Sequence, residues 1–287
     1  MHVVTHPNPP FKTRGGSLEV VELPAASDNL VWLIVGRNRR AAAVDGPDAE
    51  AALVYCDAHG LSLTTIVNTH THGDHIGINR DLERRGLLQR MRVIGPARAR
   101  AHVPGLTEAV DDGDSVELFG VDGRVILTEG HLNGHVSYVF EDVLFPGDTL
   151  FAGGCGYLFD GPPEKMFQSL TRLSALAPDT KVCCAHEYTQ DNLRFAWSVE
   201  PGSPALAERI RRVWAVREKG GSAVPSTIGE ELATNPFLRH GSAELRANVA
   251  EAFPDRALDT PGAVFAATRA LKDARGYRSR PDSVLPL

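Results

Sequence analysis

The sequence predicts an α+β protein, in which a layered β-sandwich with covering helices is followed by a smaller all-helical domain. Through residues 1–190, segments with strand character far outnumber those with helical character. They do not alternate regularly with helices, as they would in a doubly wound parallel sheet. From residue 191 the strand signal stops, and capped helical segments follow one another. We therefore expect a sandwich domain over residues 1–190 and a helical domain over residues 191–287.

The expected strands are short runs rich in β-branched and aromatic residues. Pro, Ser, Asp and Asn between residues 24 and 29 mark the turn between the first two of them. In chain order the expected strands cover residues 18–23, 30–36, 41–46, 63–68, 92–96, 115–119, 124–131, 135–148 and 180–186.

Helical patterns lie between these strands and fill the second domain. In the first domain we expect helices over residues 47–60, 78–86 and 162–176, the first of them ended by Gly60. In the second domain we expect helices over residues 203–220, 242–253 and 260–276. Ser203-Pro204 and Thr260-Pro261 each place a capping residue before a first-turn proline. The terminal "SRPDSVLPL" has no such pattern, so we expect a loose tail.

The bulk composition limits the possible partners. The chain has 287 residues, 43% hydrophobic and 23% charged, as a folded soluble protein does. A net charge of −6 gives no global electrostatic reason to expect a nucleic acid or an anionic membrane as partner. No apolar run approaches the roughly 20 residues that span a bilayer, and no leader peptide is recognisable at the N-terminus. We expect a cytoplasmic protein with four reduced cysteines, monomeric or weakly homo-oligomeric, that binds neither nucleic acid nor membrane.

The segment "HTHGDH", residues 70–75, gathers three imidazoles and a carboxylate directly after an expected strand. Alternate residues of an extended strand end face the same way, so His70 and His72 can point at one centre. Gly73 permits a sharp turn that would bring Asp74 and His75 to a neighbouring point. Such a cluster buries little apolar surface but provides good ligands for a metal ion.

Three more candidate ligands, His131, Asp148 and His186, stand at the ends of other expected strands. The seven donors are too many for one tetrahedral zinc, which takes about four. If a carboxylate bridges two ions, however, seven residues fill two sets of four, and a metal pair roughly 3.5–4 Å apart can activate water. Ligand sets without thiolate suit zinc, iron or manganese. His135 competes with His131, and spacing alone does not choose between them; we assign His135 a supporting role beside the ligands.

The segment "THTHGDHIG", residues 69–77, resembles the THxHxDH signature of the metallo-β-lactamase superfamily, which implies an αββα sandwich with its metal site at one edge. The segments "PGDTLFAGGCGYLFDG", "CAHEYTQDNLRFAWSVEPGS" and "TNPFLR" are similar to segments of glyoxalase II, the hydroxyacylglutathione hydrolases. The similarity runs through most of the chain. It implies hydrolysis of S-2-hydroxyacylglutathione thioesters, with S-lactoylglutathione as the expected substrate, as in methylglyoxal detoxification. It also implies that a hydroxide bridging two divalent metal ions attacks the thioester, with zinc as the expected metal and iron or manganese as alternatives.

The same resemblance implies roles for individual residues. One metal would be held by His70, His72 and His131, the other by Asp74, His75 and His186, with Asp148 as the bridge. Asp74 and Asp148 would be the catalytic carboxylates.

For the substrate, Tyr188 matches a tyrosine that contacts glutathione, and Arg269 and Lys272 match a basic pair that binds its glycine carboxylate. Arg269 and Lys272 lie three residues apart and so share a helix face.

Three residues depart from the family. Glu129 stands where proline is usual, in the loop beside His131. Tyr157 stands where Lys or Arg is usual, and Phe159 where some members have a tyrosine, so one charged contact to the tripeptide is missing.

Two other kinds of function stay open at this point. A glutathione persulfide dioxygenase with a single iron needs only a His-His-Asp facial set of ligands. Another hydrolase of the same fold, such as a lactonase, a β-lactamase or a nuclease, is the other alternative, although the acidic balance argues against the nuclease. The helical domain and "NPFLR" favour the thioester hydrolase over the dioxygenase.

Overall fold

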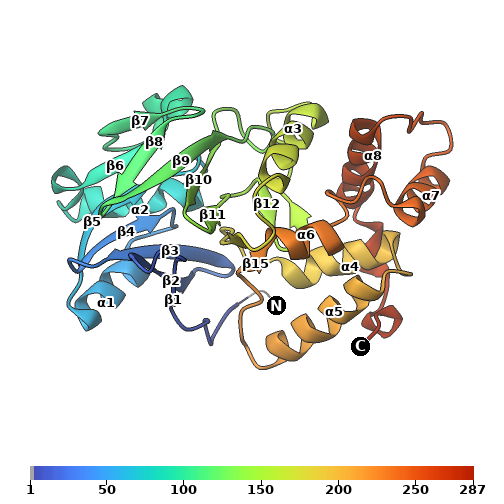
Figure 1. Ribbon diagram of the computed structural model, residues 1–287, viewed down its shortest axis with the longest axis horizontal. Helices are drawn as coiled ribbons and strands as arrows, with labels where there is room; N and C mark the ends of the chain where they lie inside the picture. The colour runs from blue at the N-terminus through green and yellow to red at the C-terminus, as the bar shows by residue number, and fades with distance from the viewer. Residues whose placement is uncertain (1–2) are drawn as a thin grey trace.

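The structure is a computed structural model that describes residues 3–287. Its first half packs two β-sheets against each other, and helices cover both outer faces (Figure 1). The strands are β1 (Phe11–Lys12), β2 (Leu18–Ala25), β3 (Asn29–Gly36), β4 (Arg40–Val44), β5 (Ser62–Val67), β6 (Arg92–Pro96), β7 (Glu108–Val110), β8 (Ser115–Leu118), β9 (Val121–Leu127), β10 (Val136–Phe140), β11 (Val143–Phe145), β12 (Leu150–Phe151), β13 (Gly154–Cys155), β14 (Lys181–Val182) and β15 (Ser226–Thr227).

One sheet has seven strands in the order β1 to β7, and the other has six in the order β15-β14-β11-β10-β9-β8. In the first sheet, β1 to β4 pair antiparallel and β4 to β7 pair in parallel. A parallel pair needs a crossover connection. Helix α1 (Glu50–His59) joins β4 to β5, and helix α2 (Gly73–Arg84) joins β5 to β6. The carboxyl ends of β4 and β5 therefore open at the same edge of the sheet.

The order of the layers follows from which residues share a core. Strand β3 is buried along its whole length. Its residues Val31, Leu33 and Val35 pack in one apolar cluster, together with residues of α1 and α2. The alternate residues Trp32 and Ile34 pack in another cluster, together with residues of β9, β10 and β11. Because successive side chains of a strand point to opposite faces, β3 has helices on one side and the second sheet on the other.

A third apolar cluster lies on the outer face of the six-stranded sheet. It joins Leu144 and Val182 of that sheet to helices α3, α4, α7 and α8. The chain thus forms an αββα sandwich, and most of its second half packs as helices against one side (Figure 1). These helices are α3 (Pro163–Ser174), α4 (Thr189–Val199), α5 (Pro204–Glu218), α6 (Ile228–Thr234), α7 (Ala243–Ala252) and α8 (Pro261–Asp273), with short 3₁₀ turns at Leu88–Arg90, Ala97–His102, Gly276–Ser279 and Asp282–Val284.

The expected caps of the second half are present. The Ser203 hydroxyl accepts a hydrogen bond from the Leu206 amide at 3.3 Å, and Thr260 Oγ1 accepts one from the Ala263 amide at 3.2 Å. Helix α4 crosses the expected division between residues 190 and 191. The two-residue strand β15 has no sequence signal; it pairs with β14 and so adds an edge strand from the helical half to the second sheet.

Three local expectations are wrong. The segment 135–148, expected as one strand, forms the antiparallel pair β10 and β11, because the chain turns between Phe140 and Val143. Helix α2 begins at Gly73 rather than at residue 78, because the amides of His75 and Ile76 both bond to the carbonyl of His72. Asp74 and His75 therefore lie on the first turn of a helix, not beyond a sharp turn at Gly73.

The C-terminal segment is not a loose tail. Arg194 of α4 pairs with Asp282 at 2.7 Å, and the indole of Trp197, also on α4, donates to the Val284 carbonyl at 2.9 Å. Leu285 is buried against α4 and α5. The segment is held because its partners lie on a helix almost ninety residues earlier, which no local pattern could reveal.

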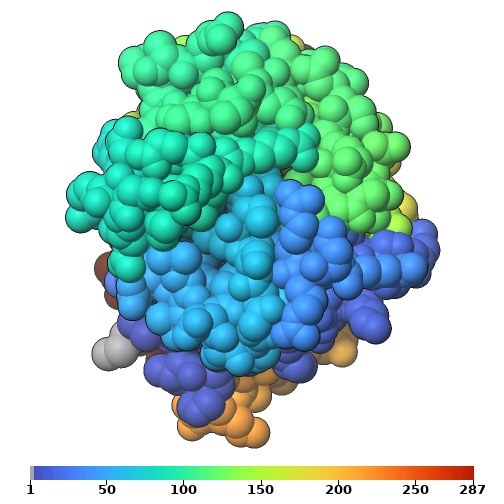
Figure 2. All heavy atoms as spheres, turned by 90° about the vertical axis from the view of Figure 1, so that its left-hand side faces the viewer, coloured from blue at the N-terminus to red at the C-terminus, as the bar shows by residue number. Residues whose placement is uncertain are grey.

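Figure 2 shows the face opposite the helical half, where residues of the first half, coloured blue to green, form most of the surface. The four cysteines are all buried and unpaired. Within residues 3–287, no helix combines the length and the apolar character that crossing a membrane requires.

Candidate metal centre

All seven candidate ligands meet at the edge of the sandwich where β4, β5 and β14 end. The loop after β5 carries His70 and His72, and the first turn of α2 carries Asp74 and His75. The other three come from loops after strands of the second sheet: His131 after β9, Asp148 after β11 and His186 after β14. A sheet braces each loop, so the side chains are held in a fixed arrangement.

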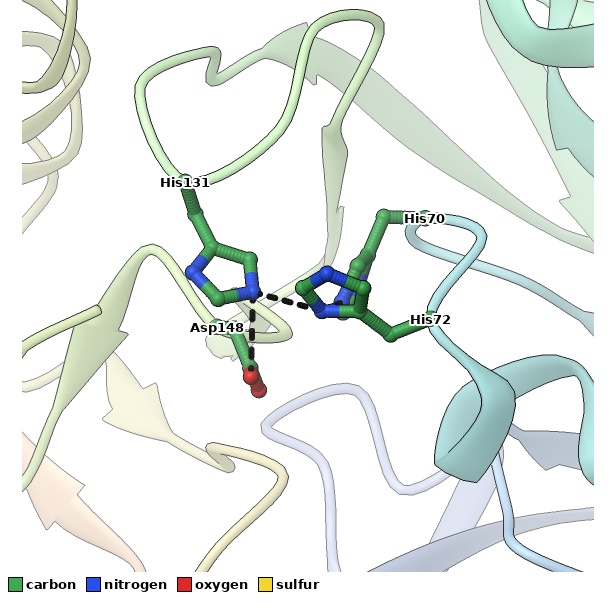
Figure 3. Close-up of side chains that lie close together, drawn as sticks. All are labelled: His70, His72, His131 and Asp148. Atoms are coloured by element: carbon green, nitrogen blue, oxygen red, sulfur yellow. Dashed lines mark hydrogen bonds and ion pairs between the residues drawn. The ribbon is translucent and has the colours of Figure 1, made fainter. Parts of the chain in front are cut away.

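Three imidazoles and one carboxylate form a first cluster (Figure 3). His72 Nδ1 lies 3.1 Å from His70 Nε2 and 2.9 Å from His131 Nε2. His131 Nε2 lies 3.4 Å from Asp148 Oδ2. The ligand atoms of all four residues lie within 4.8 Å of one another.

Asp74, His75 and His186 form a second cluster beside the first. His186 Nε2 lies 3.4 Å from His75 Nε2 and 3.4 Å from Asp74 Oδ2. Asn29 of β3 donates to the same Asp74 oxygen at 3.1 Å and so orients that carboxylate.

Asp148 stands between the two clusters. Its Oδ2 faces His131, whereas its Oδ1 lies 3.4 Å from His75 Nε2 and 3.5 Å from His186 Nε2. Gly147, with φ of +50°, turns the chain there, and a Cβ at this position would stand 2.4 Å from Thr69 Oγ1. The sequence therefore needs glycine before Asp148, both for the left-handed backbone and for the close approach to the β5 loop.

His135 supports this arrangement from behind. It is fully buried, and its Nε2 accepts a hydrogen bond from the Asp148 amide at 3.2 Å. Its ring also stacks on that of His70, with the centroids 4.7 Å apart. It thus lies beside the candidate ligands, as expected from the sequence.

The outer nitrogens of the ligand histidines are hydrogen-bonded, which fixes the ring orientations. His131 Nδ1 donates to the Tyr157 carbonyl at 2.8 Å. His186 Nδ1 lies 2.8 Å from Asp28 Oδ1, and His75 Nδ1 lies 3.0 Å from Asp45 Oδ2.

The sequence reasoning missed both of these carboxylates. Asp45 directly follows β4, so its place at a strand end was a usable signal. Asp28 lies in the β2–β3 turn and has no such signal.

The charges of the cluster are strongly coupled. Burial favours the neutral form of His75, but the carboxylates of Asp148 and Asp45 outweigh burial and hold its pKa well above the ordinary value. Burial likewise opposes a charge on His186, yet Asp148, Asp28 and Asp74 raise its pKa to about 9. For His70, burial and the neighbouring positive charge of His75 both act to lower the pKa well below the ordinary value. The imidazoles of the cluster therefore compete for positive charge: His75 and His186 favour the protonated form, and His70 favours the neutral one.

These residues fit divalent cations. Pairs of imidazole nitrogens face each other at 2.9–3.4 Å, so either a proton or a bound cation lies between them. Asp148 Oδ1 is buried and, among the described residues, accepts no hydrogen bond. A buried carboxylate oxygen without a hydrogen bond is costly unless a cation binds it. The His and Asp clusters therefore indicate metal binding.

A cavity of about 770 Å³ opens beside the centre. The ring of Tyr188 stacks on that of His186, with the centroids 4.8 Å apart. The ring of Phe159 lies edge-on to those of His72 and His131, with centroid distances of 5.0 and 5.3 Å. Tyr157 packs edge-on against Phe159, and both side chains are more than half exposed. The cavity is lined by Phe151, Cys155, Tyr157, Phe159, Tyr188, Asp191, Asn192, Arg269, Lys272, Asp273, Arg275, Tyr277 and Arg278.

Arg269 and Lys272 of α8 reach the cavity from the helical half. Arg269 is buried, donates to the Cys155 carbonyl at 3.1 Å and pairs with Asp273 at 2.5 Å. Lys272 bonds to the amide oxygen of Asn192, and its ammonium lies over the rings of two buried phenylalanines. Because burial disfavours its charge, the pKa of Lys272 falls to about 7. An anion that enters the cavity would restore that charge.

Comparison with known proteins divides the chain between two family models. Residues 45–186 match the model of the metallo-beta-lactamase superfamily, and residues 187–275 match the model of the hydroxyacylglutathione hydrolase C-terminus. The second match begins directly where the first one ends, one residue after His186.

Individual proteins extend this likeness. A hydroxyacylglutathione hydrolase of Methylococcus capsulatus is 46% identical over 263 residues, 89% of this chain and 98% of that protein. Among solved structures, ETHE1 from Myxococcus xanthus is 23% identical and superposes with a TM-score of 0.55 over 86% of this chain and 94% of its own. TTHA1623, solved in a di-iron-bound form, is 25% identical with a TM-score of 0.50 over 76% of this chain and 99% of its own.

Proposed function

The chain belongs to the hydroxyacylglutathione hydrolases within the metallo-β-lactamase superfamily, and from this membership we propose that it hydrolyses S-2-hydroxyacylglutathione thioesters, with S-lactoylglutathione as the substrate. The observation that carries the proposal is the position of Asp148, whose two oxygens face two separate histidine clusters beside a cavity lined with cations. Such a centre supplies the nucleophile for hydrolysis, and the cavity supplies the binding site for an anionic thiol.

We assign seven residues to two cations. His70, His72 and His131 would hold one, Asp74, His75 and His186 the other, and Asp148 would contact both. Zinc is the expected metal, with iron or manganese as alternatives; the di-iron form of TTHA1623 supports a pair of ions. When bound, the cations lower the pKa of a water molecule and polarise the thioester carbonyl.

The chain's own carboxylates then orient the reacting groups. The side chain of Asp74 is 43% exposed, whereas that of Asp148 is 9% exposed. Asp74 is therefore the carboxylate that we assign to orient the attacking water. A thiol with a pKa of about 8.5 leaves readily as thiolate. No additional general acid is required, which agrees with the lack of any Ser-His-Asp pattern in the sequence.

Substrate binding falls to residues around the cavity. Arg269 and Lys272 would hold the glycine carboxylate of glutathione, since both line the cavity in a buried setting. Tyr188 would contact the tripeptide, and Tyr157 would offer it an aromatic face in place of the cation usual in the family. In this division, residues 1–190 hold the metal centre and residues 191–287 supply the carboxylate site. The four buried thiols support a reducing, cytoplasmic setting.

The alternatives are less well supported. The match of residues 187–275 to a hydroxyacylglutathione hydrolase model argues against a persulfide dioxygenase and against a lactonase. The ligand atoms of the second cluster would also be left without a role in a centre that holds a single iron.

The direct test is thiol release from S-lactoylglutathione, measured with and without a chelator, together with elemental analysis of the purified protein. We expect chelator-sensitive release and close to two metal ions per chain. Oxygen consumption with glutathione persulfide, in the absence of thioester hydrolysis, would contradict the proposal.

Arg269→Ala is expected to raise KM about tenfold with kcat nearly unchanged. The reason is that a hydrogen bond to a charged group is worth about 1.5 kcal/mol, and this one is made equally in the ground and transition states. Steady-state kinetics on S-lactoylglutathione check this. Arg256→Ala is the matched control, because Arg256 lies over Phe253 and does not line the cavity. A fall in kcat with unchanged KM would contradict the assigned role.

A further inference from the structure

Helix α8 and the residues after it place a row of three cations on one wall of the cavity. Arg269, Lys272 and Arg275 follow one another at intervals of three residues, and all three line the cavity. The first two belong to the carboxylate site already described. Arg275 has had no role so far.

Arg275 differs from the other two in its environment. Arg269 and Lys272 are buried and have partners within the protein, whereas Arg275 is exposed. Among residues 3–287, no hydrogen bond or ion pair of its guanidinium is found. The nearby acids do not neutralise it, because Asp273 pairs with Arg269 and Asp191 pairs with Arg278. An uncommitted guanidinium therefore stands at the wall of the substrate cavity.

The backbone of Arg275 is also unusual. It has φ of +57° and ψ of +13°, a left-handed conformation that costs a non-glycine residue roughly 1–2 kcal/mol. Helices commonly end with glycine in this conformation, and here an arginine occupies the position. Strain of this kind at a cavity is consistent with a functional side chain.

The chain on both sides of Arg275 is held firmly. Its amide donates to the Lys272 carbonyl at 3.0 Å, and its carbonyl accepts from the Arg278 amide at 3.1 Å. Tyr277 is buried and donates to Asp191 of α4 at 2.7 Å. Arg278 binds the same carboxylate with two nitrogens at 3.0 and 2.9 Å. The backbone that carries the Arg275 side chain is thus fixed to α4, a helix that also lines the cavity.

We propose that Arg275 binds the second carboxylate of the glutathione moiety, that of the γ-glutamyl residue. This inference rests on the proposed function. A glutathione thioester carries two carboxylates, and Arg269 and Lys272 account for one. Helix α8 rises about 6 Å from Arg269 to its last residue, Asp273, and Arg275 lies two residues further along the same wall. The two cation positions are therefore spread along the cavity, as the ends of an extended tripeptide of roughly 10 Å are. Arg275 thereby supplies a positive charge to a glutathione site in which Tyr157 replaces the Lys or Arg that is usual in the family.

Two substrates distinguish the loss of a contact to the γ-glutamyl carboxylate from a general loss of substrate affinity. S-lactoylglutathione carries both carboxylates, whereas S-lactoyl-N-acetylcysteinylglycine keeps the glycine carboxylate and lacks the γ-glutamyl residue. Its acetyl group blocks the S-to-N acyl transfer that a free cysteine amine would cause. In the metal-loaded enzyme, Arg275→Gly is expected to raise KM about fivefold for the first substrate, the upper range for an exposed ion pair. KM for the second substrate and kcat for both should stay unchanged. Glycine is favoured at this φ, so the variant should fold at least as stably as the parent chain.

The controls use the same two substrates. Arg275→Lys keeps the charge and should restore most of the lost affinity, and Arg280→Ala removes an arginine that does not line this cavity and should change nothing. An unchanged KM in Arg275→Gly, or an equal rise for both substrates, overturns the proposal while leaving the hydrolase function intact. If the parent enzyme hydrolyses neither thioester, the proposed function fails. In that case the role of Arg275 is tested by measuring the calorimetric Kd of S-methylglutathione for the parent chain and for Arg275→Gly. A Kd about fivefold higher in the variant supports the role of Arg275, and an equal Kd overturns it.

Discussion

Asp148→Ala is expected to abolish thioester hydrolysis, with a loss in kcat of about 10³-fold or more. A loss of this size is typical when one group that stabilises charge in an active site is removed. Asp148 faces both histidine clusters at once, through Oδ2 at 3.4 Å from His131 and Oδ1 at 3.4 Å from His75. Without it, two sets of cation ligands lose the anion that they share, so both cations should bind more weakly.

Steady-state kinetics and elemental analysis test this together. The Asp148→Ala protein should contain at most one metal ion per chain, and Asp148→Asn, which keeps the shape but not the charge, should be similarly impaired. Asp160→Ala is the matched control, because Asp160 is exposed and accepts a hydrogen bond only from the Asn133 amide among the described residues. A full complement of two metals with unchanged kcat in Asp148→Ala would disprove the bridging role.

Glu231→Ala is expected to lower the free energy of unfolding by about 3–5 kcal/mol, the usual cost of breaking a buried ion pair by removing one partner. Arg209 and Glu231 are 2% and 0% exposed, and Arg209 Nη2 lies 2.6 Å from Glu231 Oε1. Glu231 Oε2 also accepts from the Gly153 amide at 2.8 Å and from Asn235 at 2.9 Å. The substitution would leave a buried guanidinium with too few acceptors and free the β12–β13 hairpin from its anchor.

Denaturant unfolding of the metal-loaded protein measures the effect. Glu230→Ala is the matched control on the same helix. Glu230 pairs closely with the exposed Arg212 and reaches the buried Arg209 only at 3.5 Å, and exposed pairs contribute less than about 1 kcal/mol. Replacing both partners, as Arg209→Met with Glu231→Leu, should recover much of the loss, since neither charge then stays buried alone. Equal effects of Glu230→Ala and Glu231→Ala would contradict the assignment.

The same ion pair links stability to the substrate cavity. Glu231 accepts a hydrogen bond from Gly153, in the turn of the β12–β13 hairpin. Two residues later in the same hairpin, the Cys155 carbonyl accepts a hydrogen bond from Arg269. A variant of Glu231 should therefore raise KM in addition to lowering stability, whereas the kcat of the properly folded fraction should change little.

Features that depend on neighbouring residues could be predicted from the amino-acid sequence alone. The runs of apolar residues predicted the strands, and Ser203-Pro204 and Thr260-Pro261 predicted helix starts that the structure confirms. The crowding of His70, His72, Asp74 and His75 after a strand predicted a metal site, because few other purposes bring such donors together. These inferences succeed because propensity, capping and ligand chemistry act over a few residues.

Contacts between groups that are distant in the sequence became visible only in the folded chain. Asp28 and Asp45 orient ligand histidines that lie far away in the sequence, and Asp148 faces two clusters because Gly147 turns its backbone toward β5. The ordered C-terminal segment likewise depends on partners on α4. Hydrogen bonds and ion pairs act over a few ångströms, so their partners are set by the path of the folded chain, and that path is invisible in any short stretch of sequence.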